Sequence, residues 1–494
     1  MQEPGKKGAN PFFLFALVYI CLHLWKFICA KEEYMKEKKK KEIDFTTGPL
    51  MGKLVRFMLP VLLALFLQAL YGAVDLAIIG KFTQTASVSG VSMGSQVTTG
   101  ITNIVAGFAT GITVLLGQYI GQGKKKNAGE VIGNSIIFFA ALAIFITVLM
   151  IVLAVPLLNL FNIPQEALSQ GTIYLRICSG GFIFIVAYNL IGGIFRGIGD
   201  STTPLITVAC ACVINIIGDF ILIAGCGMAA AGAAIATVFA QAASVLISLL
   251  LMKKGGLPFE FSKASFKINW KLIGRMIKLG LPLGIQEIFI TASFLILSAV
   301  INTLGLVASA GIGVGGKVMT FILLVPTAFM QSLAAIVSQN VGALKIKRAK
   351  KALVNGILLS LAISVVIFYF GFFHGTVFTQ IFTNDPEVVQ AAAEFVKDYA
   401  IDSMLTSFLF CFVGYFNGCG KTTITLAQGI VGVMIRIPTA IIIRNSSIAS
   451  IFTIGLATPI STSVQIIVCL TFFFATNKKV TAMYSEVEIA QDTV

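Results

Sequence analysis

Two stretches of the chain, QYIGQGKKKNA at 118–128 and QNVGALKIKRA at 339–349, share the pattern Gln-x-x-Gly-x-x-Lys-x-Lys-x-Ala at an offset of 221 residues. Each stretch ends one long apolar run and begins the next. Two further segments repeat at an offset of 221 or 222 residues. Their matched residues are Lys53/Arg275, Arg56/Lys278, Leu59-Pro60/Leu281-Pro282, Gly193/Gly414, Phe195/Phe416, Gly197/Gly418, Gly199/Gly420, Thr202/Thr423 and Leu205/Leu426. The sequence therefore predicts two copies of one structural unit.

The composition places both copies in a membrane. Hydrophobic residues make up 57% of the 494 positions and charged residues 12%, against about 25% charged in a typical soluble domain. The net charge of +15 comes from lysines and arginines that gather between apolar runs. This is the distribution of cytoplasmic loops under the positive-inside rule, and it argues against a nucleic-acid partner.

Apolar runs long enough to cross a hydrocarbon layer of about 30 Å predict twelve membrane spans. In the first half they lie near 54–80, 89–120, 128–160, 167–195, 202–224 and 229–252, and in the second near 272–304, 309–341, 350–381, 388–416, 423–444 and 450–476. Six spans per copy give both copies the same orientation. The predicted fold is an all-α polytopic membrane protein of two six-helix bundles, related by a parallel pseudo-two-fold repeat with a cavity between them.

The flanking segments complete the predicted organisation. An apolar run at 12–30 inside the N-terminal extension is a thirteenth span, a signal-like segment, or plain upstream sequence before Met35, and the last reading is slightly favoured. The predicted parts are the extension 1–42, the bundle 43–252, a cytoplasmic linker 253–271, the bundle 272–476 and a tail 477–494. We expect a multi-pass protein of the cell (inner or plasma) membrane, with the termini of its main body cytoplasmic.

Ionisable residues inside predicted spans are candidates for function because they are costly to bury in a bilayer. Asp75 in the first span and Asp219 in the fifth lie at similar depth, in the outer half. Gln68 lies two turns before Asp75, and Asn215 lies one turn before Asp219. Low-dielectric burial favours a protonated carboxyl group, so these four residues predict a proton or cation site. The alternative is that either Asp caps a helix end.

The second half has different polar residues. Arg436 occupies the repeat position of Asn215, and an arginine within the membrane finds a partner. Glu287 and Asp402 are the acids at comparable depth, so we expect an ion pair that is structural or gating, rather than a second cation site. With two histidines in the chain, the sequence contains no catalytic or metal-ligand constellation, and we expect neither an enzyme nor a bound metal.

Several motifs in this order resemble the multidrug and toxic compound extrusion (MATE) family over residues 43–476. They are Ile43–Pro49 (IDFTTGP) with Leu59-Pro60, Gln68–Asp75 (QALYGAVD) with Ile79-Gly80, Phe195–Pro204 (FRGIGDSTTP), Asn215–Asp219 (NIIGD), Ala231–Thr237 (AGAAIAT) with Gln241, and Arg436–Pro438 (RIP).

The resemblance implies twelve helices around a central cavity, and export of organic, often cationic or amphipathic, compounds driven by inward flow of H⁺ or Na⁺. It places Asp75, Asn215 and Asp219 in the family's cation pocket. We expect small-molecule substrates and membrane lipids as partners, no cofactor beyond the coupling ion, and a monomer. The residues expected to line the substrate cavity are Tyr71, Tyr188, Asn189, Gln241 and Gln286.

Two departures from the family pattern narrow the expectation. Phe220 stands where a proline often follows the acid of the fifth span, which puts the local helix geometry in doubt. Thr291 stands where some members carry a glutamate, while Glu287 lies four residues earlier. The second departure weakens the transfer of a C-terminal sodium site and favours the DinF-type branch over the NorM-type branch. Coupling to H⁺ or to Na⁺ stays open. The rivals are a lipid-linked oligosaccharide flippase of the same superfamily, a membrane-embedded enzyme and a passive channel.

Overall fold

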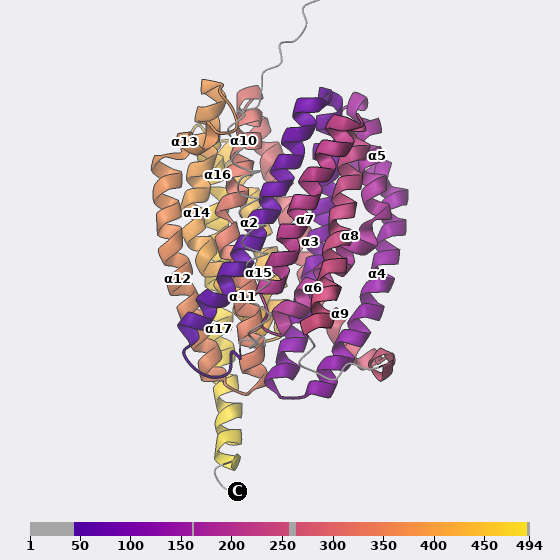
Figure 1. The fold of residues 1–494 in the computed structure, drawn as a ribbon. Coiled ribbons are helices and arrows are strands. Elements are labelled where there is room, and N and C mark those ends of the chain that lie inside the picture. Colours follow the sequence, from indigo (N-terminus) through magenta and orange to yellow (C-terminus); the bar gives the residue numbers. More distant parts are fainter. Residues whose placement is uncertain (1–43, 161–162, 256–262, 492–494) are drawn as a thin grey trace, which may run out of the picture. The chain divides into compact units, whose positions relative to one another are not determined.

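The computed structural model describes residues 44–160, 163–255 and 263–491 (Figure 1), so the apolar run at 12–30 lies outside the described residues. Every regular element in these ranges is a helix. The helices of the first half are α2 (Leu50–Phe82), α3 (Thr85–Gly121), α4 (Lys125–Leu160), α5 (Gln165–Gly180), α6 (Phe182–Gly197), α7 (Thr202–Asp219), the π-helix η1 (Phe220–Gly225) and α8 (Ala229–Gly255). Those that follow are the 3₁₀-helix η2 (Lys263–Phe266), α9 (Trp270–Asn302), α10 (Leu306–Ile322), α11 (Leu324–Gly342), α12 (Ile346–Phe373), α13 (Gly375–Thr379), α14 (Pro386–Gly418), α15 (Thr422–Arg444), α16 (Ile451–Gly455) and α17 (Ala457–Gln491).

Eleven stretches of the described chain are helical, long and apolar enough to cross a membrane. In this count α7 continues into η1, α10 into α11, and α16 into α17. The twelfth is the pair α5 and α6, which passes the same test as one span bent by 55°. The predicted fold class, an all-α polytopic protein with a two-bundle repeat, is confirmed.

The bend is a departure from the continuous helix predicted at 167–195, and it has a local cause. Gly181 lies at the break between α5 and α6. A Cβ atom there would be 2.3 Å from Cγ1 of Val238 in α8, a distance that no real Cβ contact tolerates. Gly181 leaves space for the Val238 side chain, and the helix changes direction at this pair of adjacent glycines, Gly180 and Gly181.

The chain forms two compact units. Unit 1 is Met1–Gly284 with Ala335–Arg348, and unit 2 is Ile285–Ala334 with Ala349–Val494. The predicted bundle limits, 43–252 and 272–476, stay a prediction.

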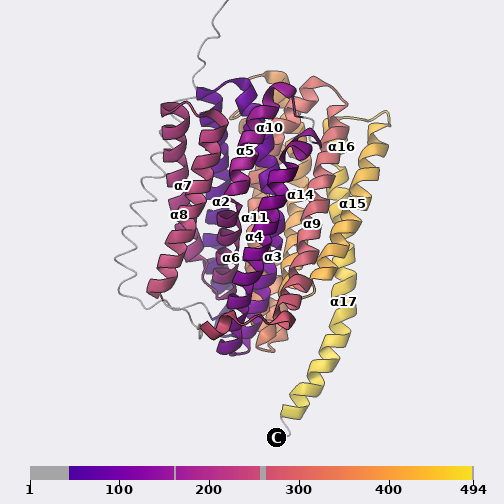
Figure 2. The same ribbon diagram turned by 90° about the vertical axis from the view of Figure 1, so that its right-hand side faces the viewer.

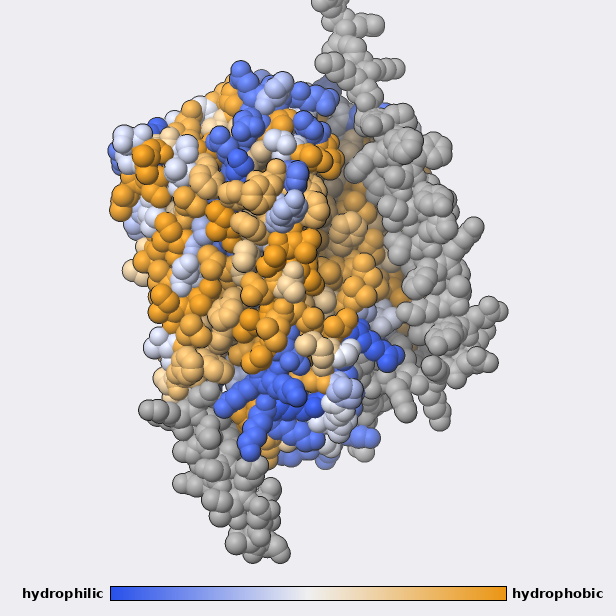
Figure 3. Space-filling model, turned by 90° about the vertical axis from the view of Figure 1, so that its left-hand side faces the viewer, coloured by the Kyte–Doolittle hydropathy of each residue, from blue (hydrophilic) through white to orange (hydrophobic). Residues whose placement is uncertain are grey.

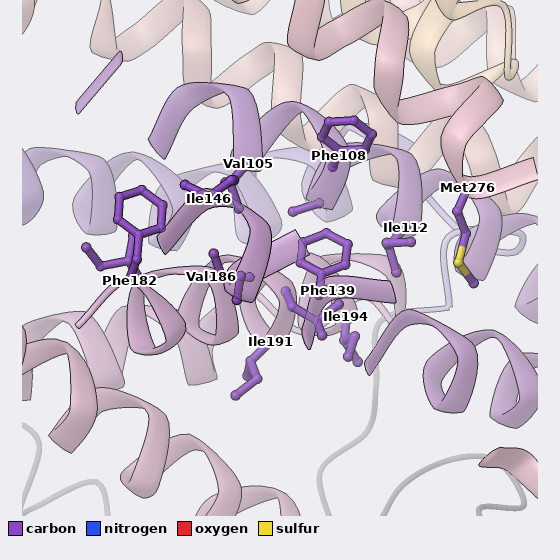
Figure 4. Close-up of a cluster of buried hydrophobic side chains, with 14 of the residues drawn as sticks. Val105, Phe108, Ile112, Phe139, Ile146, Phe182, Val186, Ile191, Ile194 and Met276 are labelled. Atoms are coloured by element: carbon purple, nitrogen blue, oxygen red, sulfur yellow. The ribbon is translucent and has the colours of Figure 1, made fainter. Parts of the chain in front are cut away.

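Unit 1 is organised around α3, which packs against α4, α5 and α6, while α7 and α8 lie side by side (Figures 1 and 2). Its main apolar cluster joins four of these helices (Figure 4). Phe108 of α3, Phe139 of α4 and Phe182 of α6 fill it, and Met276 adds the first half of α9 to the same cluster. Burial of these side chains holds α3, α4, α5 and α6 together with the start of α9.

The segment Ala335–Arg348 joins unit 1 through a contact that obeys the sequence repeat. A Cβ atom on Gly121 would lie 2.0 Å from the carbonyl oxygen of Gln339, and one on Gly342 would lie 2.1 Å from that of Gln118. Gly121 and Gly342 are repeat partners, and so are Gln118 and Gln339. The ends of α3 and α11 therefore meet through the same contact made twice, as two copies of a subunit do in an isologous interface.

The same segment holds the start of the described chain. The carbonyl oxygen of Phe45 accepts hydrogen bonds from Asn340 Nδ2 at 3.3 Å and from Arg348 Nε at 2.8 Å, and that of Thr46 accepts one from Lys345 Nζ at 2.9 Å. Phe45 is fully buried. The entry to α2 is thus fixed before the first span begins.

Unit 2 is organised around α14, which packs against α10, α13, α16 and α17. Tyr399 of α14 lies at its centre, with ring centroids 5.0 Å from Phe395 and 6.3 Å from Phe294. On the face shown in Figure 3, a broad apolar band separates two ends where hydrophilic residues gather. This is the surface expected of a protein whose middle contacts lipid.

Candidate ion-binding site

Two carboxyl groups meet inside unit 1. Asp75 of α2 is 6% exposed and Asp219 of α7 is fully buried, and the two helices pack directly against each other. The two carboxyl groups lie close enough to interact electrostatically. Because an ionised carboxylate only accepts hydrogen bonds, a bond between them requires that one of the two carries a proton.

The polar atoms of this pair lack other partners in the described part of the chain. Asp75 Oδ1, both oxygens of Asp219, and both the oxygen and the nitrogen of the Asn215 amide are buried with no hydrogen-bond partner. Buried polar atoms in folded proteins are nearly always paired. Such a group of atoms is suited to bind a proton or a small cation.

An apolar frame surrounds the acids. Val74, Ile78, Cys212, Ile216 and Tyr174 belong to one buried cluster with residues of α8. In such a buried, apolar environment charges interact more strongly than they do in water.

The helix carrying Asp219 changes form directly after it. Phe220 begins the π-helix η1, which continues to Gly225. The doubt that the sequence raised about local geometry at Phe220 is thereby resolved: the helix continues with a wider turn instead of a proline. Single π-helical turns inside helices are frequent at functional sites.

Four of the residues expected in the cavity lie in unit 1 with Gln68. Gln68 Nε2 donates to the Tyr188 hydroxyl at 2.6 Å, so the structure pairs this amide with α6. Tyr71 interacts with Gln241 of α8. Asn189 Nδ2 donates to the carbonyl oxygen of Ile185 in its own helix at 2.9 Å. The other expected residue, Gln286, belongs to unit 2, where it is 8% exposed and contacts Gly429 of α15.

Arg436 of α15 has neighbours other than the acids suggested by the sequence. Its Nη1 donates to Ser293 Oγ at 3.3 Å, and its guanidinium lies 4.7 Å from the centre of the Phe294 ring. In the described ranges no salt bridge within 4.0 Å joins it to Glu287 or Asp402. The ion pair therefore stays a prediction, and a cation–π contact holds the guanidinium in place.

Asp402 and a second acid form a polar cluster in unit 2. Asp402 is 4% exposed, and its Oδ2 accepts a hydrogen bond from Thr406 Oγ1 at 2.6 Å. Asp398, one turn earlier on α14, is fully buried; its Oδ1 accepts from the Tyr399 amide at 2.9 Å, and its Oδ2 has no partner in the described residues. A glycine, Gly455 of α16, leaves space for this side chain. Our sequence reasoning missed Asp398, although the spacing of four residues from Asp402 inside one predicted span could have indicated it.

A family model agrees with this arrangement and with the repeat. The MatE family model matches the chain twice, at residues 60–221 and 282–442. The two matches begin 222 residues apart and end 221 residues apart, which is the register of the internal repeat. Together they cover more than half of the chain.

Relatives and solved structures point the same way. The chain is 27% identical over 303 residues to the probable multidrug resistance protein YpnP of Bacillus subtilis, covering 61% of this chain and 67% of the relative. It is 22% identical over 396 residues to the multidrug export protein MepA of Staphylococcus aureus, covering 78% and 86%. A transporter of the MOP superfamily from Pyrococcus furiosus has the same fold, with a TM-score of 0.84 at 20% identity over 91% of this chain and 100% of the neighbour.

An outward-facing MATE family transporter of the same superfamily gives a TM-score of 0.83 at 21% identity, over 90% of this chain and 99% of the neighbour. The fold and the twofold match define a multi-spanning membrane transport protein. This chain belongs to the MatE family.

Proposed function

We propose that this protein is an antiporter that exports small organic compounds, cationic or amphipathic, in exchange for inward flow of H⁺ or Na⁺ by alternating access. The observation that carries the proposal is the facing pair Asp75 and Asp219, whose buried oxygens lack hydrogen-bond partners in the described chain. A transporter needs such a group to bind its coupling ion in one state and release it in another.

In the proposed mechanism the two carboxyl groups hold the ion together. When a proton is bound, one group donates to the other, and the pair carries a single negative charge. When the proton leaves, two like charges face each other in an apolar frame and repel. Na⁺ in the same place would be held by the carboxylate oxygens and by the Asn215 amide oxygen. Either event changes the energy of packing between α2 and α7, and this change links ion binding to a conformational change.

The substrate class is proposed from the relatives. YpnP and MepA are named for multidrug resistance and multidrug export, which supports export of varied organic compounds. The flippase alternative would require a more cationic site, whereas the candidate site in unit 1 presents two acids. The proposal further places the protein as a monomer in the cell membrane, with the lysine-rich ends of its helices toward the cytoplasm.

The Asp75→Asn variant tests the coupling assignment. An amide cannot release a proton and carries no charge for Na⁺, so we expect loss of ion-driven efflux with expression and monodispersity unchanged. Purified protein in vesicles would be loaded with a fluorescent organic cation, and efflux measured under an imposed proton gradient and then under a sodium gradient. The unmutated protein in the same assay identifies the coupling ion.

Asp398→Asn is the matched control, since it removes a fully buried carboxyl group from unit 2 that is not among the acids expected to pair with Arg436. Coupled efflux should persist in this variant. Unchanged efflux in Asp75→Asn under both gradients would falsify the assignment of coupling to the pair in unit 1.

A further inference from the structure

The linker between the two halves presents apolar side chains outside any predicted span. Ile268 is 55% exposed and Trp270 is 76% exposed, and Phe266 beside them is 41% exposed. Lys267 and Lys271 alternate with them and are also exposed. Large apolar residues on a polar linker require an explanation when they lie close together.

The backbone of the linker is held in place by hydrogen bonds to Asn134, a buried residue of α4. Asn134 is fully buried; its Nδ2 donates to the carbonyl oxygen of Lys267 at 3.1 Å, and its Oδ1 accepts from the Asn269 amide at 2.7 Å. Gly133 beside it leaves space for the carbonyl group of Ser265. Figure 1 shows η2, which begins this segment, next to the lower end of α4. The segment is thus fixed with its apolar side chains pointing outward.

The exposed apolar side chains continue onto a helix face. Asn269 caps α9 by accepting from the amides of Lys271 and Leu272 at 3.1 and 3.3 Å. From Trp270, residues seven and eleven positions later are Ile277 and Leu281, which lie on the same side of an α-helix. They are 37% and 44% exposed. The apolar side chains of the linker therefore continue into an exposed apolar stripe on α9.

We propose that Ser265–Lys271 is an interfacial anchor for anionic phospholipid. Ile268 and Trp270 enter the headgroup layer of the leaflet at the lysine-rich end of the protein, where tryptophan is favoured because one side of its ring is apolar and its N–H is polar. Lys267 and Lys271 bind the phosphate groups of anionic lipids. The anchor holds the first turn of α9, and it does so whichever ion drives transport.

The chain offers a direct optical test, because it contains two tryptophans, Trp25 and Trp270. In the full-length Trp25→Phe variant, all tryptophan emission comes from Trp270. We expect emission shifted to the blue of tryptophan in water, and stronger quenching by phospholipids brominated near the headgroup than by those brominated near the chain end. Phe239→Trp, on a 65% exposed position of α8, made with both native tryptophans changed to Phe, is the control and should show the opposite order.

Varying the charge of the lipid headgroup tests the proposed preference for anionic phospholipid. Quenching by brominated phosphatidylglycerol should exceed that by brominated phosphatidylcholine. The preference should fall by about fivefold for each of Lys267→Gln and Lys271→Gln and weaken with salt. Asn134→Ala should keep the fold but remove the hydrogen bonds that hold the linker backbone. We therefore expect Trp270 to occupy a wider range of depths in the membrane.

Two results would overturn the anchor. Quenching of Trp270 by aqueous iodide with none from brominated lipid would place the segment in water. Protection from both quenchers would mean that protein covers it, for example a second copy of the chain. Equal quenching by the two headgroups, unaffected by the lysine substitutions, would overturn the assignment of anionic lipid.

Discussion

At Asp75 and Asp219 the protein keeps two carboxyl groups where the described neighbours supply no hydrogen-bond donor to three of their oxygens. A structural acid of this kind would be destabilising without compensation, since an unpaired buried polar group costs about 1–3 kcal/mol. Asp398 in unit 2 is less extreme. Its Oδ1 accepts a hydrogen bond from the Tyr399 amide, and only its Oδ2 has no partner among the described residues. The contrast supports the pair in unit 1 as the ion site.

Asp44 gives a residue-scale prediction outside the spans. Partial burial raises the pKa of its carboxyl group, but hydrogen bonds from the Thr47 and Thr46 hydroxyls and the Thr46 amide, with Lys53 nearby, outweigh this and hold the pKa below its usual value. A lowered folded-state pKa stabilises the protein above the unfolded value of about 3.9, and this stability is lost as the pH falls through the lower folded value.

We therefore expect Asp44→Asn to lower the unfolding temperature slightly at neutral pH. The loss in free energy of unfolding should be less than about 1 kcal/mol, because water screens this exposed group. The difference from the unmutated protein should shrink as the pH falls below the unfolded value of about 3.9 and through the lower folded value. Thermal unfolding in detergent across this range measures it. A difference that stays constant with pH would mean that the ionised carboxylate contributes nothing.

The candidate residues could be predicted because an acid in an apolar run is conspicuous in any sequence. Their partners could not. Gln68 hydrogen-bonds Tyr188 in α6, 120 positions later, which its spacing from Asp75 did not indicate, and its part in the ion site stays a prediction. Arg436 contacts Ser293 and Phe294, which its position in the repeat did not indicate, and its pairing with Glu287 or Asp402 stays a prediction. Which of two nearby groups a long side chain reaches depends on helix rotation, and sequence spacing does not give that.

At the scale of elements, the two adjacent glycines at the bend between α5 and α6 have different surroundings. A Cβ on Gly181 would meet Val238 at 2.3 Å, while Gly180 has nothing within 4 Å. Gly181→Ala should destabilise the protein by about 1–3 kcal/mol through overpacking. Gly180→Ala should be neutral or stabilising by up to about 1 kcal/mol, since alanine favours the helix.

Unfolding temperatures of the two variants in the same detergent, read by size-exclusion chromatography after heating, compare these effects. Equal temperatures for both variants would show that α8 yields at Val238, and the bend would then need another cause.

Most elements were predicted because an apolar run of about 20 residues has few alternatives in a membrane protein. The bend and the π-helix were not. Both depend on a close approach or a local widening, at Gly181 and Phe220, whose cause lies in another helix or in the backbone itself. Hydrophobic periodicity contains no such information.

At the scale of the whole molecule, the sequence repeat reappears as the symmetric contact between the ends of α3 and α11. Gly342→Ala should destabilise by about 1–3 kcal/mol, because its Cβ would be 2.1 Å from the carbonyl oxygen of Gln118. Gly121→Ala should do the same at Gln339. Since each substitution pushes apart the same two helix ends, the double variant should lose less than the sum of the two.

Gly72→Ala in α2, where nothing lies within 4 Å, is the control and should not destabilise. A thermal unfolding series over the four variants completes the cycle. Strict additivity would mean that the two glycines act separately and that the contact is not one unit.

The late position of Ala335–Arg348 in the chain also sets an order of assembly. The carbonyl group of Phe45 finds its partner Arg348 only 303 positions later, and at about 5–20 residues per second this is a wait of about 15–60 s during synthesis. During that time Phe45 and Thr46 lack these hydrogen-bond partners. We expect a chain whose synthesis stops before Arg348 to be degraded more readily than the complete protein. The last step in folding the first half is the synthesis of part of the second.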